Sequence, residues 1–283
     1  MAETINWIPN VGSTINLTDG SNYMVRQGLD GRHMPTFTFN SEPVFTYPGE
    51  VLRSVLVNKR EIIVPLVVYG TDADDLRTNL RALQASFNPM NGAGSLQVVT
   101  DEASPRTFQI DCCYESGMTF QENTDTGNYK TRIFVATFIA HSPYWYDPTP
   151  STHNLTNGSN PITYYGDVDT YPVITVTGPI YGGGISITNS ATGKSIAWVP
   201  TGGTFYAGDE LYINCIPGQR TVCVSTGNCS GLGPWPAYTP GRAAQLLSAT
   251  SSMNFNLVPG TNTLTWSGGN VVTMTFYNQY NGI

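Results

Sequence analysis

The sequence IFVATFIAHSPYWYDP, at residues 133–148, is the clearest single indication of how the chain is organised. An apolar, β-branched run ends there in the aromatic triplet Tyr144, Trp145 and Tyr146, which lies between Pro143 and Pro148. Proline has no backbone N–H for a sheet ladder and restricts the residue before it to extended conformations. The stretch therefore predicts that a strand and a domain end here, with the aromatic triplet as the structural anchor of the boundary.

Composition supports two β-rich domains. The chain has 283 residues, which is enough for two domains that each bury a core. Only 12% of the residues are charged, while 29 glycines and 19 prolines are spread along the chain, as is typical of a turn-rich β protein. Counted along the sequence, residues 1–150 carry 10 basic and 16 acidic side chains, whereas residues 151–283 carry 3 and 4. The net charge of −7 and the lack of a basic cluster argue against nucleic-acid recognition.

One helix is expected, over residues 72–87. Thr71 or Asp72 can cap its first turn, and the Asn88-Pro89 pair stops it. Four apolar side chains recur at helical spacing and predict one buried face, formed by Leu76, Leu80, Leu83 and Phe87. We expect this helix to pack on a sheet within the first domain.

The rest of the first domain reads as strands. Residues 33–41 alternate Phe and Thr, which predicts a half-buried strand, and residues 60–69 form a β-branched run. Pro65 within that run indicates an edge or a bulge. Residues 95–100 and 106–114 form further strands, followed by a long hairpin with arms near 112–120 and 129–140. These elements predict a β-sandwich or barrel-like domain with one helix and one long hairpin.

The second half predicts an all-β domain. Residues 149–165 read as a linker that becomes a first strand. Short strands then follow at regular spacing, separated by Gly-, Asn- and Pro-containing turns, at residues 173–177, 184–188, 195–199, 210–214, 220–224, 253–257, 262–266 and 271–277. Strands at this spacing without a helix are typical of a β-sandwich.

Four segments in this order resemble the siphophage distal tail protein family. They are Arg60–Pro65 followed by the helix, Ser142–Pro148, Tyr171–Pro179 and Phe255–Leu264. The resemblance implies a ring-forming (belt) domain at residues 1–148 and a galectin-like β-sandwich at residues 149–283. A large insertion that a longer family member has in the second domain is missing here, which argues against an extra carbohydrate-binding arm.

The same resemblance implies a function and partners. The chain would be a structural component of a phage tail tip, located in the virion at the distal end of the tail. It would form a homo-hexameric ring between the tail tube protein and a lysin-like tail-tip hub protein, with receptor-binding proteins as further partners. No enzymatic activity and no cofactor are expected of such a protein.

The side chains that carry chemistry agree with a structural role. None of the histidines, at His33, His141 and His153, belongs to a metal motif or a catalytic triad. The acidic pairs Asp167/Asp169 and Asp209/Glu210 do not match a calcium loop and read as turn residues. We therefore expect no catalytic residue and no metal ligand. The chain opens without the basic and apolar segments of a signal peptide, and no apolar run is long enough to enter a membrane.

Five cysteines are loosely spaced and do not form a complete disulfide framework. Cys112 and Cys113 are adjacent in an expected strand, so their side chains point to opposite faces. The remaining cysteines lack the paired spacing of a zinc site. A Cys223–Cys229 bridge stays open, because the redox compartment would decide it.

Two other functions compete with the structural one. The low charge and the aromatic residues of the second half also suit a monomeric carbohydrate-binding adhesin module. Its best contact would be the proline-held Trp235 and Tyr238, in the stretch Gly233–Gly241. A loop folded over the end of the sandwich is the alternative for this stretch. A glycoside hydrolase is disfavoured because no suitable pair of acids is present.

Overall fold

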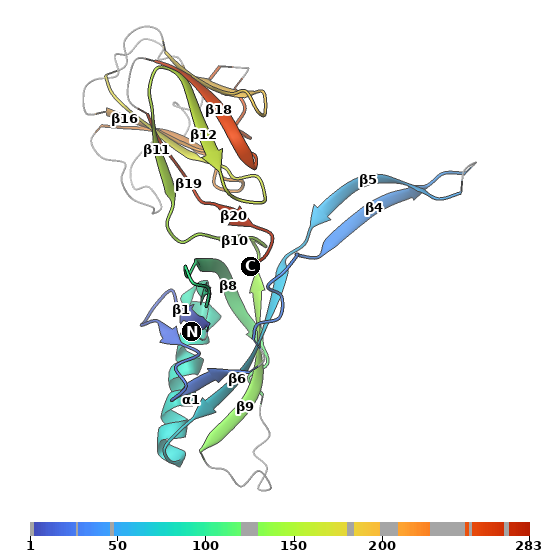
Figure 1. Cartoon of the computed structure of the whole chain (residues 1–283), viewed down its shortest axis with the longest axis vertical. Helices are drawn as coiled ribbons and strands as arrows, with labels where there is room; N and C mark the ends of the chain where they lie inside the picture. Colours follow the sequence, from blue (N-terminus) through green and yellow to red (C-terminus); the bar gives the residue numbers. More distant parts are fainter. Residues whose placement is uncertain are drawn as a thin grey trace. The chain divides into compact units, whose positions relative to one another are not determined.

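The chain folds into two compact units. The computed structural model describes the whole chain except residues 1–2, 27, 46–47, 120–129, 180–183, 199–208, 227–246, 249–250 and 269–271. Unit 1 comprises Met1–Pro148 together with Tyr280–Ile283, and unit 2 comprises Thr149–Gln279 (Figure 1). The last four residues thus belong to unit 1, whereas the sequence pattern placed them in the second domain. The aromatic ring of Tyr280 explains this, because it packs edge-on against Phe108, with 5.3 Å between ring centroids.

Unit 1 is built around a nine-stranded, barrel-like sheet. The main path runs β2-β1-β7-β8-β9-β6-β3, and β10 and β20 join it at the side. The strands are β1 (Thr4–Ile8), β2 (Ile15–Asn16), β3 (Tyr23–Val25), β6 (Arg60–Tyr69), β7 (Gly94–Val99), β8 (Thr107–Ser116), β9 (Thr131–Ala140), β10 (Trp145–Tyr146) and β20 (Gln279–Tyr280). Two further strands, β4 (Phe37–Pro43) and β5 (Glu50–Val57), pair only with each other.

The helix forms where the sequence predicts it. Helix α1 (Ala73–Phe87) is capped by Asp72, whose side chain accepts hydrogen bonds from the backbone N–H groups of Asp74 and Asp75. Its four apolar residues at helical spacing are all buried, as expected. A short 3₁₀ turn, η1 (Pro89–Asn91), follows it.

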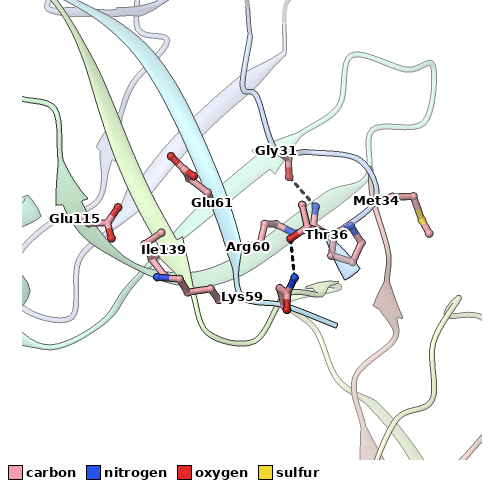
Figure 2. Close-up of a pocket in the computed structure, with 10 residues that line it drawn as sticks. Gly31, Met34, Thr36, Lys59, Arg60, Glu61, Glu115 and Ile139 are labelled. Atoms are coloured by element: carbon pink, nitrogen blue, oxygen red, sulfur yellow. Dashed lines mark hydrogen bonds between the residues drawn. The ribbon is translucent and has the colours of Figure 1, made fainter. Parts of the chain in front are cut away.

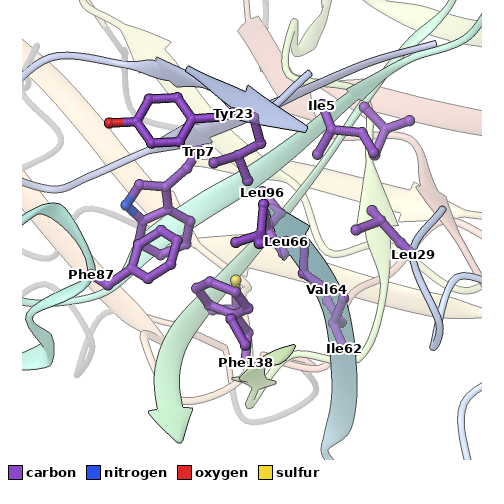
Figure 3. Close-up of a cluster of buried hydrophobic side chains, with 14 of the residues drawn as sticks. Ile5, Trp7, Tyr23, Leu29, Ile62, Val64, Leu66, Phe87, Leu96 and Phe138 are labelled. Atoms are coloured by element: carbon purple, nitrogen blue, oxygen red, sulfur yellow. The ribbon is translucent and has the colours of Figure 1, made fainter. Parts of the chain in front are cut away.

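The core of unit 1 joins the helix to the sheet. Figure 3 shows Trp7 from β1 beside Phe87 from α1 and Phe138 from β9. The ring centroid of Trp7 lies 5.3 Å from that of Phe87 and 5.0 Å from that of Phe138. The indole Nε1 of Trp7 donates to the carbonyl of Ser86 at 3.0 Å, so the large ring is buried with its polar group satisfied.

Of the two alternatives predicted for Pro65, an edge or a bulge, the edge is wrong, and the environment of a second strand also differs from the prediction. Strand β6 is not an edge, because it pairs with β9 from end to end and with β3 over Leu66–Val68. Beside Pro65, the N–H of Arg26 donates to the proline carbonyl at 2.9 Å, and the next bridge on that side joins Asp30 to Ile63, so the pairing around the proline is irregular. The strand predicted as half-buried at residues 33–41 is also different, because β4 is almost entirely exposed.

Unit 2 is a β-sandwich. One sheet has the order β11-β19-β13-β16-β17 and the other β12-β18-β14-β15, and their buried side chains form one core. The strands are β11 (Ser151–Leu155), β12 (Gly158–Tyr164), β13 (Val173–Thr177), β14 (Ile185–Asn189), β15 (Lys194–Trp198), β16 (Asp209–Asn214), β17 (Thr221–Thr226), β18 (Gly260–Ser267) and β19 (Val272–Phe276). The predicted fold class is confirmed: mostly β, with one barrel-like and one sandwich unit.

Two details of unit 2 differ from expectation. Residues 149–165 contain two strands, β11 and β12, where a linker and a single strand were expected. Residues 253–257 were expected to be a strand, but only Leu257 makes a bridge, to Thr170. That segment instead turns, and Asn256 uses its side chain to accept from Lys194 and to donate to Asp169. Side-chain hydrogen bonds of this kind compete with a sheet ladder.

Strands β12 and β18 begin with the same turn. In each, an asparagine side chain reaches back to the residue four positions earlier, accepting from its N–H and donating to its carbonyl. Asn160 does so to Thr156 and Asn262 does so to Val258, with distances between 2.7 and 3.1 Å. A glycine with positive φ, Gly158 or Gly260, sits two residues before each asparagine. The two turns differ in burial, since Asn262 is fully buried and Asn160 is not.

Candidate interaction site

Strands β4 and β5 form a hairpin, here called the arm, that pairs with no other strand among the described residues. Their register pairs Phe37 with Val57 and Phe39 with Val55, and it shifts at a bulge after Asn40. Every residue of the two strands except Phe37 is exposed. Figure 1 shows the arm as two paired strands set apart from the barrel strands of unit 1. Because an isolated two-stranded ribbon is marginal in water, the arm needs another surface for full stability.

The two faces of the arm differ in chemistry. Side chains of paired residues share a face, so one face carries Phe37, Phe39, Leu52, Val55 and Val57, here called the apolar face. Phe39 is 65% exposed and Leu52 55% exposed. The opposite face is mixed, with polar pairs such as Asn40–Ser54, whose side chains hydrogen-bond at 2.9 Å, beside Val51 and Leu56. Large exposed apolar patches mark sites that contact proteins, membranes or ligands.

A buried arginine lies where the arm joins the barrel. Arg60, the first residue of β6, is only 3% exposed. Its Nε donates to the carbonyl of Pro143 at 2.6 Å, and one terminal nitrogen donates to the carbonyls of Gly31, at 2.7 Å, and His33. The other terminal nitrogen donates to the carbonyl of Asn281. Loss of hydration lowers the pKa of Arg60 to about 10, so the guanidinium is still charged at neutral pH.

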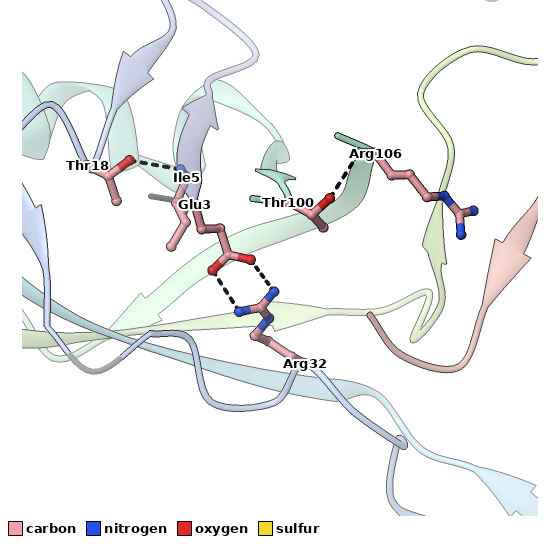
Figure 4. A network of polar contacts seen from close by, with 6 residues as sticks. All are labelled: Glu3, Ile5, Thr18, Arg32, Thr100 and Arg106. Atoms are coloured by element: carbon pink, nitrogen blue, oxygen red, sulfur yellow. Dashed lines mark hydrogen bonds and ion pairs between the residues drawn. The ribbon is translucent and has the colours of Figure 1, made fainter. Parts of the chain in front are cut away.

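The segment that enters the arm is fixed a second time next to these bonds. The guanidinium of Arg32 pairs with both carboxylate oxygens of Glu3, at 2.8 and 2.5 Å (Figure 4). In the same view Thr18 accepts from the N–H of Ile5, and Thr100 accepts from that of Arg106. A two-pronged arginine–carboxylate pair fixes orientation as well as distance. The chain before β4 is therefore tied to the start of β1.

A cavity of about 560 Å³ lies at the base of the arm. Its lining combines the arm's base with β6, β8 and β9, through Gly31, Met34, Pro35, Thr36, Asn58, Lys59, Arg60, Glu61, Glu115 and Ile139. Figure 2 shows Glu61, Glu115 and Lys59 around Ile139, with Arg60 bonded to Gly31. The cavity has charges of both signs, and we find no arrangement in it of a nucleophile and a base.

The aromatic triplet lies in unit 1. Trp145 is 0% exposed and belongs to the unit 1 core, and no hydrogen-bond partner for its Nε1 is found among the described residues. The hydroxyl of Tyr146 donates to Asp111 at 2.7 Å and accepts from Gln109 at 2.9 Å. Tyr144 is partly buried. The other predicted contact residues, Trp235 and Tyr238, lie outside the described residues, as does Cys229.

The remaining candidates show local structural contacts. His153 stacks on Phe276 with 5.5 Å between ring centroids, and Asp169 accepts from Asn256 at 2.6 Å. Burial strongly raises the pKa of the Cys112 thiol, whereas its neighbour Cys113 is only partly buried. Within the described part of the chain, no cluster of three or more His, Cys, Asp or Glu side chains fits a metal ion. No helix there is long and apolar enough to cross a membrane.

Sequence reasoning missed both central features of this site. The arm's second strand was not expected, although EVLRSVLV at residues 50–57 is rich in β-branched residues and follows the Pro48-Gly49 turn signal. Arg60 was identified only as the start of a strand. Arginine is usually exposed, so a single arginine beside an apolar run does not predict a buried side chain.

Fold and site together define a two-unit β protein with an exposed hairpin. No known sequence family and no curated protein matches the chain. Solved structures do match its fold. The crystal structure of the Dit protein of phage SPP1, described as a paradigm of the hub adsorption apparatus in phages infecting Gram-positive hosts, matches with a TM-score of 0.71 and 18% identity, over 99% of both chains.

A second match comes from a phage tail assembly. A chain in the structure of the phage P2 baseplate, in its activated conformation with Ca, matches with a TM-score of 0.56 and 11% identity, over 100% of both chains. The same baseplate with Sr gives the same values. The resemblance to distal tail proteins seen in the sequence is thus confirmed at the level of the fold.

Proposed function

We propose that this chain is a structural component of a phage tail tip, at the distal end of the tail in the virion. The observation that carries the proposal is the likeness to SPP1 Dit, which spans 99% of both chains and so includes both units. The similarity to a chain of the phage P2 baseplate supports the same location. The protein acts by binding other proteins, and catalysis is no part of this function.

The finer proposal is a closed homo-hexameric ring made through unit 1. Its support is the arm, whose apolar face has no partner among the described residues of its own chain. A contact between different surfaces of identical copies closes into a ring when the rotation fits. The apolar face of each arm would lie on the next copy, and burying side chains such as Phe39 and Leu52 would supply the driving force.

The ring joins the tail tube protein on one side to a lysin-like tail-tip hub protein on the other, with receptor-binding proteins as further partners. Unit 2 is proposed as the galectin-like domain on the outside of the ring. We assign any glycan or partner contact of unit 2 to Trp235 and Tyr238. Glycan binding by the full chain that survives Trp235→Ala with Tyr238→Ala would move this contact elsewhere.

Oligomeric mass tests the ring directly. Native mass spectrometry of the full chain at micromolar concentration should give six copies for the wild type. The pair Phe39→Ser with Leu52→Ser removes apolar area from the apolar face and should leave monomers. The matched pair Val51→Ser with Leu56→Ser removes similar side chains from the opposite face and should leave the hexamer intact. A wild-type monomer across this range, or loss of the hexamer in both pairs, would contradict the proposal.

A further inference from the structure

The base of the arm is built around a single buried cation. Arg60 follows β5 by three residues, and its guanidinium is surrounded by backbone carbonyls from three separate stretches of chain. The first stretch is the segment that enters the arm, which contributes Gly31 and His33. The others are the Ser142-Pro143 turn and the returning segment, defined as residues 280–283. Four of the five N–H groups of the guanidinium donate in this way.

The chemistry of this arrangement makes the four bonds interdependent. A buried guanidinium loses its hydration, and the hydrogen-bond partners described for Arg60 are all backbone carbonyls. If one carbonyl moves away, the buried charge loses part of its stabilisation. The remaining hydrogen bonds then contribute less to holding the cluster together. A lysine at this position could not reproduce the pattern, because its ammonium is a compact charge without the planar fork.

The bonds fix both ends of the arm's base. The Arg60 side chain holds the carbonyls of Gly31 and His33 on the entering side, while its own backbone belongs to the leaving side. Between this point and the arm, the N–H of Asn58 donates to the carbonyl of Thr36 at 2.9 Å and closes the hairpin. The bonds around Arg60 therefore tie together the two chain segments at the base of the arm.

The returning segment is held against the entering segment as well. The N–H of Ile283 donates to the carbonyl of Arg32 at 3.1 Å. Gly282 lies so close that a Cβ on it would meet the Cα of His33 at 2.9 Å and the carbonyl oxygen of Arg32 at 3.0 Å. Only glycine allows this close approach, so the returning segment packs directly against the backbone at the arm's base.

We propose that Arg60 is the positioning residue of the arm, and that its shell is complete only when the returning segment has docked. Asn281 follows the whole of unit 2 in the sequence, so the arm takes its final direction after the chain has come back from unit 2. The arm of an incomplete chain would be misdirected and unable to join an assembly. This last step rests on the proposed ring function, whereas the coupling of Arg60 to the returning segment does not.

Amide hydrogen exchange on the full chain tests the coupling. Arg60→Lys removes the fork, and Gly282→Ala pushes the returning segment away without altering Arg60. Both should speed exchange at least about tenfold in peptides covering residues 31–36 and 56–60, and leave the β7 peptide at residues 94–99 unchanged. The double variant should be no faster than the faster single variant, because both changes break the same cluster.

The control is Val98→Ala, which removes a buried side chain of β7 from the unit 1 core. It should destabilise the barrel and speed exchange there without a selective effect on the peptides at the arm's base. Unchanged exchange at the base in both single variants would overturn the proposal. So would fully additive effects in the double variant, or a uniform rise through the barrel like that of Val98→Ala. If the wild type fails to form rings while exchange behaves as expected, the ring function fails and the positioning role stands.

Discussion

The hydroxyl of Tyr280 donates to Oδ2 of Asp147 at 2.9 Å, which brings the end of the chain to the residue just before Pro148. The same hydroxyl accepts from a terminal nitrogen of Arg106 at 3.0 Å, and that guanidinium lies over the Phe108 ring, 4.8 Å from its centroid. One phenol oxygen thus joins an acid and a base from two different parts of unit 1.

Tyr280→Phe should destabilise unit 1 by about 1.5–3 kcal/mol, the range for hydrogen bonds to charged groups. The ring would remain packed on Phe108, so the loss reports the hydroxyl alone. Urea-dependent amide exchange in β8 measures it. Tyr165→Phe is the control, because Tyr165 is 74% exposed and its change should cost almost nothing. Equal stability of Tyr280→Phe and the wild type would refute this account.

Trp145→Ala should lower the free energy of unfolding of unit 1 by about 3–5 kcal/mol, because it removes a fully buried indole from the core. Trp145→Phe should cost less, since it keeps most of the apolar ring and gives up no hydrogen bond identified in the described structure. Calorimetry of the full chain compares the two variants. An unchanged unit 1 transition together with lost glycan binding would instead make Trp145 a ligand residue.

Asn262→Ala should destabilise unit 2 more than Asn160→Ala, although both residues close the same kind of turn. The buried Asn262 also accepts from Nδ2 of Asn189 at 2.9 Å, so its loss leaves buried groups unpaired at a cost of about 1–3 kcal/mol each. Asn160 is partly exposed, and water replaces its bonds. Denaturation midpoints of the two variants give the comparison, and equal losses would count against burial as the cause.

Alkaline pH should weaken unit 2 through Tyr164. Burial raises the pKa of its phenol to about 12, and the hydroxyl donates to the carbonyl of Val168 at 2.6 Å. In the unfolded chain the phenol ionises near its ordinary pKa of 10.0, so this contribution is complete below pH 10 and is lost as the pH rises from 10 toward 12. Melting of unit 2 at stepped pH measures the slope.

Tyr164→Phe should flatten that slope, while Tyr165→Phe, a change at the exposed neighbour, should leave it as in the wild type. A slope that is identical in all three proteins would assign the alkaline transition to other groups.

The elements that the sequence predicted well share one property, a periodic pattern whose partner surface lies in the same unit. Strand β6 spans the predicted residues 60–69, and α1 buries the predicted face, because burial and periodicity coincide there. The arm was misjudged because alternation such as Phe37 and Phe39 specifies two faces but cannot say whether anything covers them.

The interaction site needed the fold. Arg60 is recognisable only when Gly31, Pro143 and Asn281, far apart in the sequence, converge on it. The return of residues 280–283 to unit 1 was missed for the same reason, since four residues after a strand carry no pattern of their own. The asparagine turns, in contrast, were readable in part, because a glycine two residues before an asparagine is a local signal.

The contact between Asp147 and Tyr280 has a consequence for how this chain can change over time. The chain leaves unit 1 after Pro148 and returns to it at Tyr280, which is hydrogen-bonded to Asp147. In the sequence, unit 2 is thus an insertion between two parts of unit 1. Such a module can be lengthened, replaced or decorated while the barrel, the arm and the Arg60 shell keep their geometry. Changes in unit 2 and changes in unit 1 can therefore be selected separately within one polypeptide.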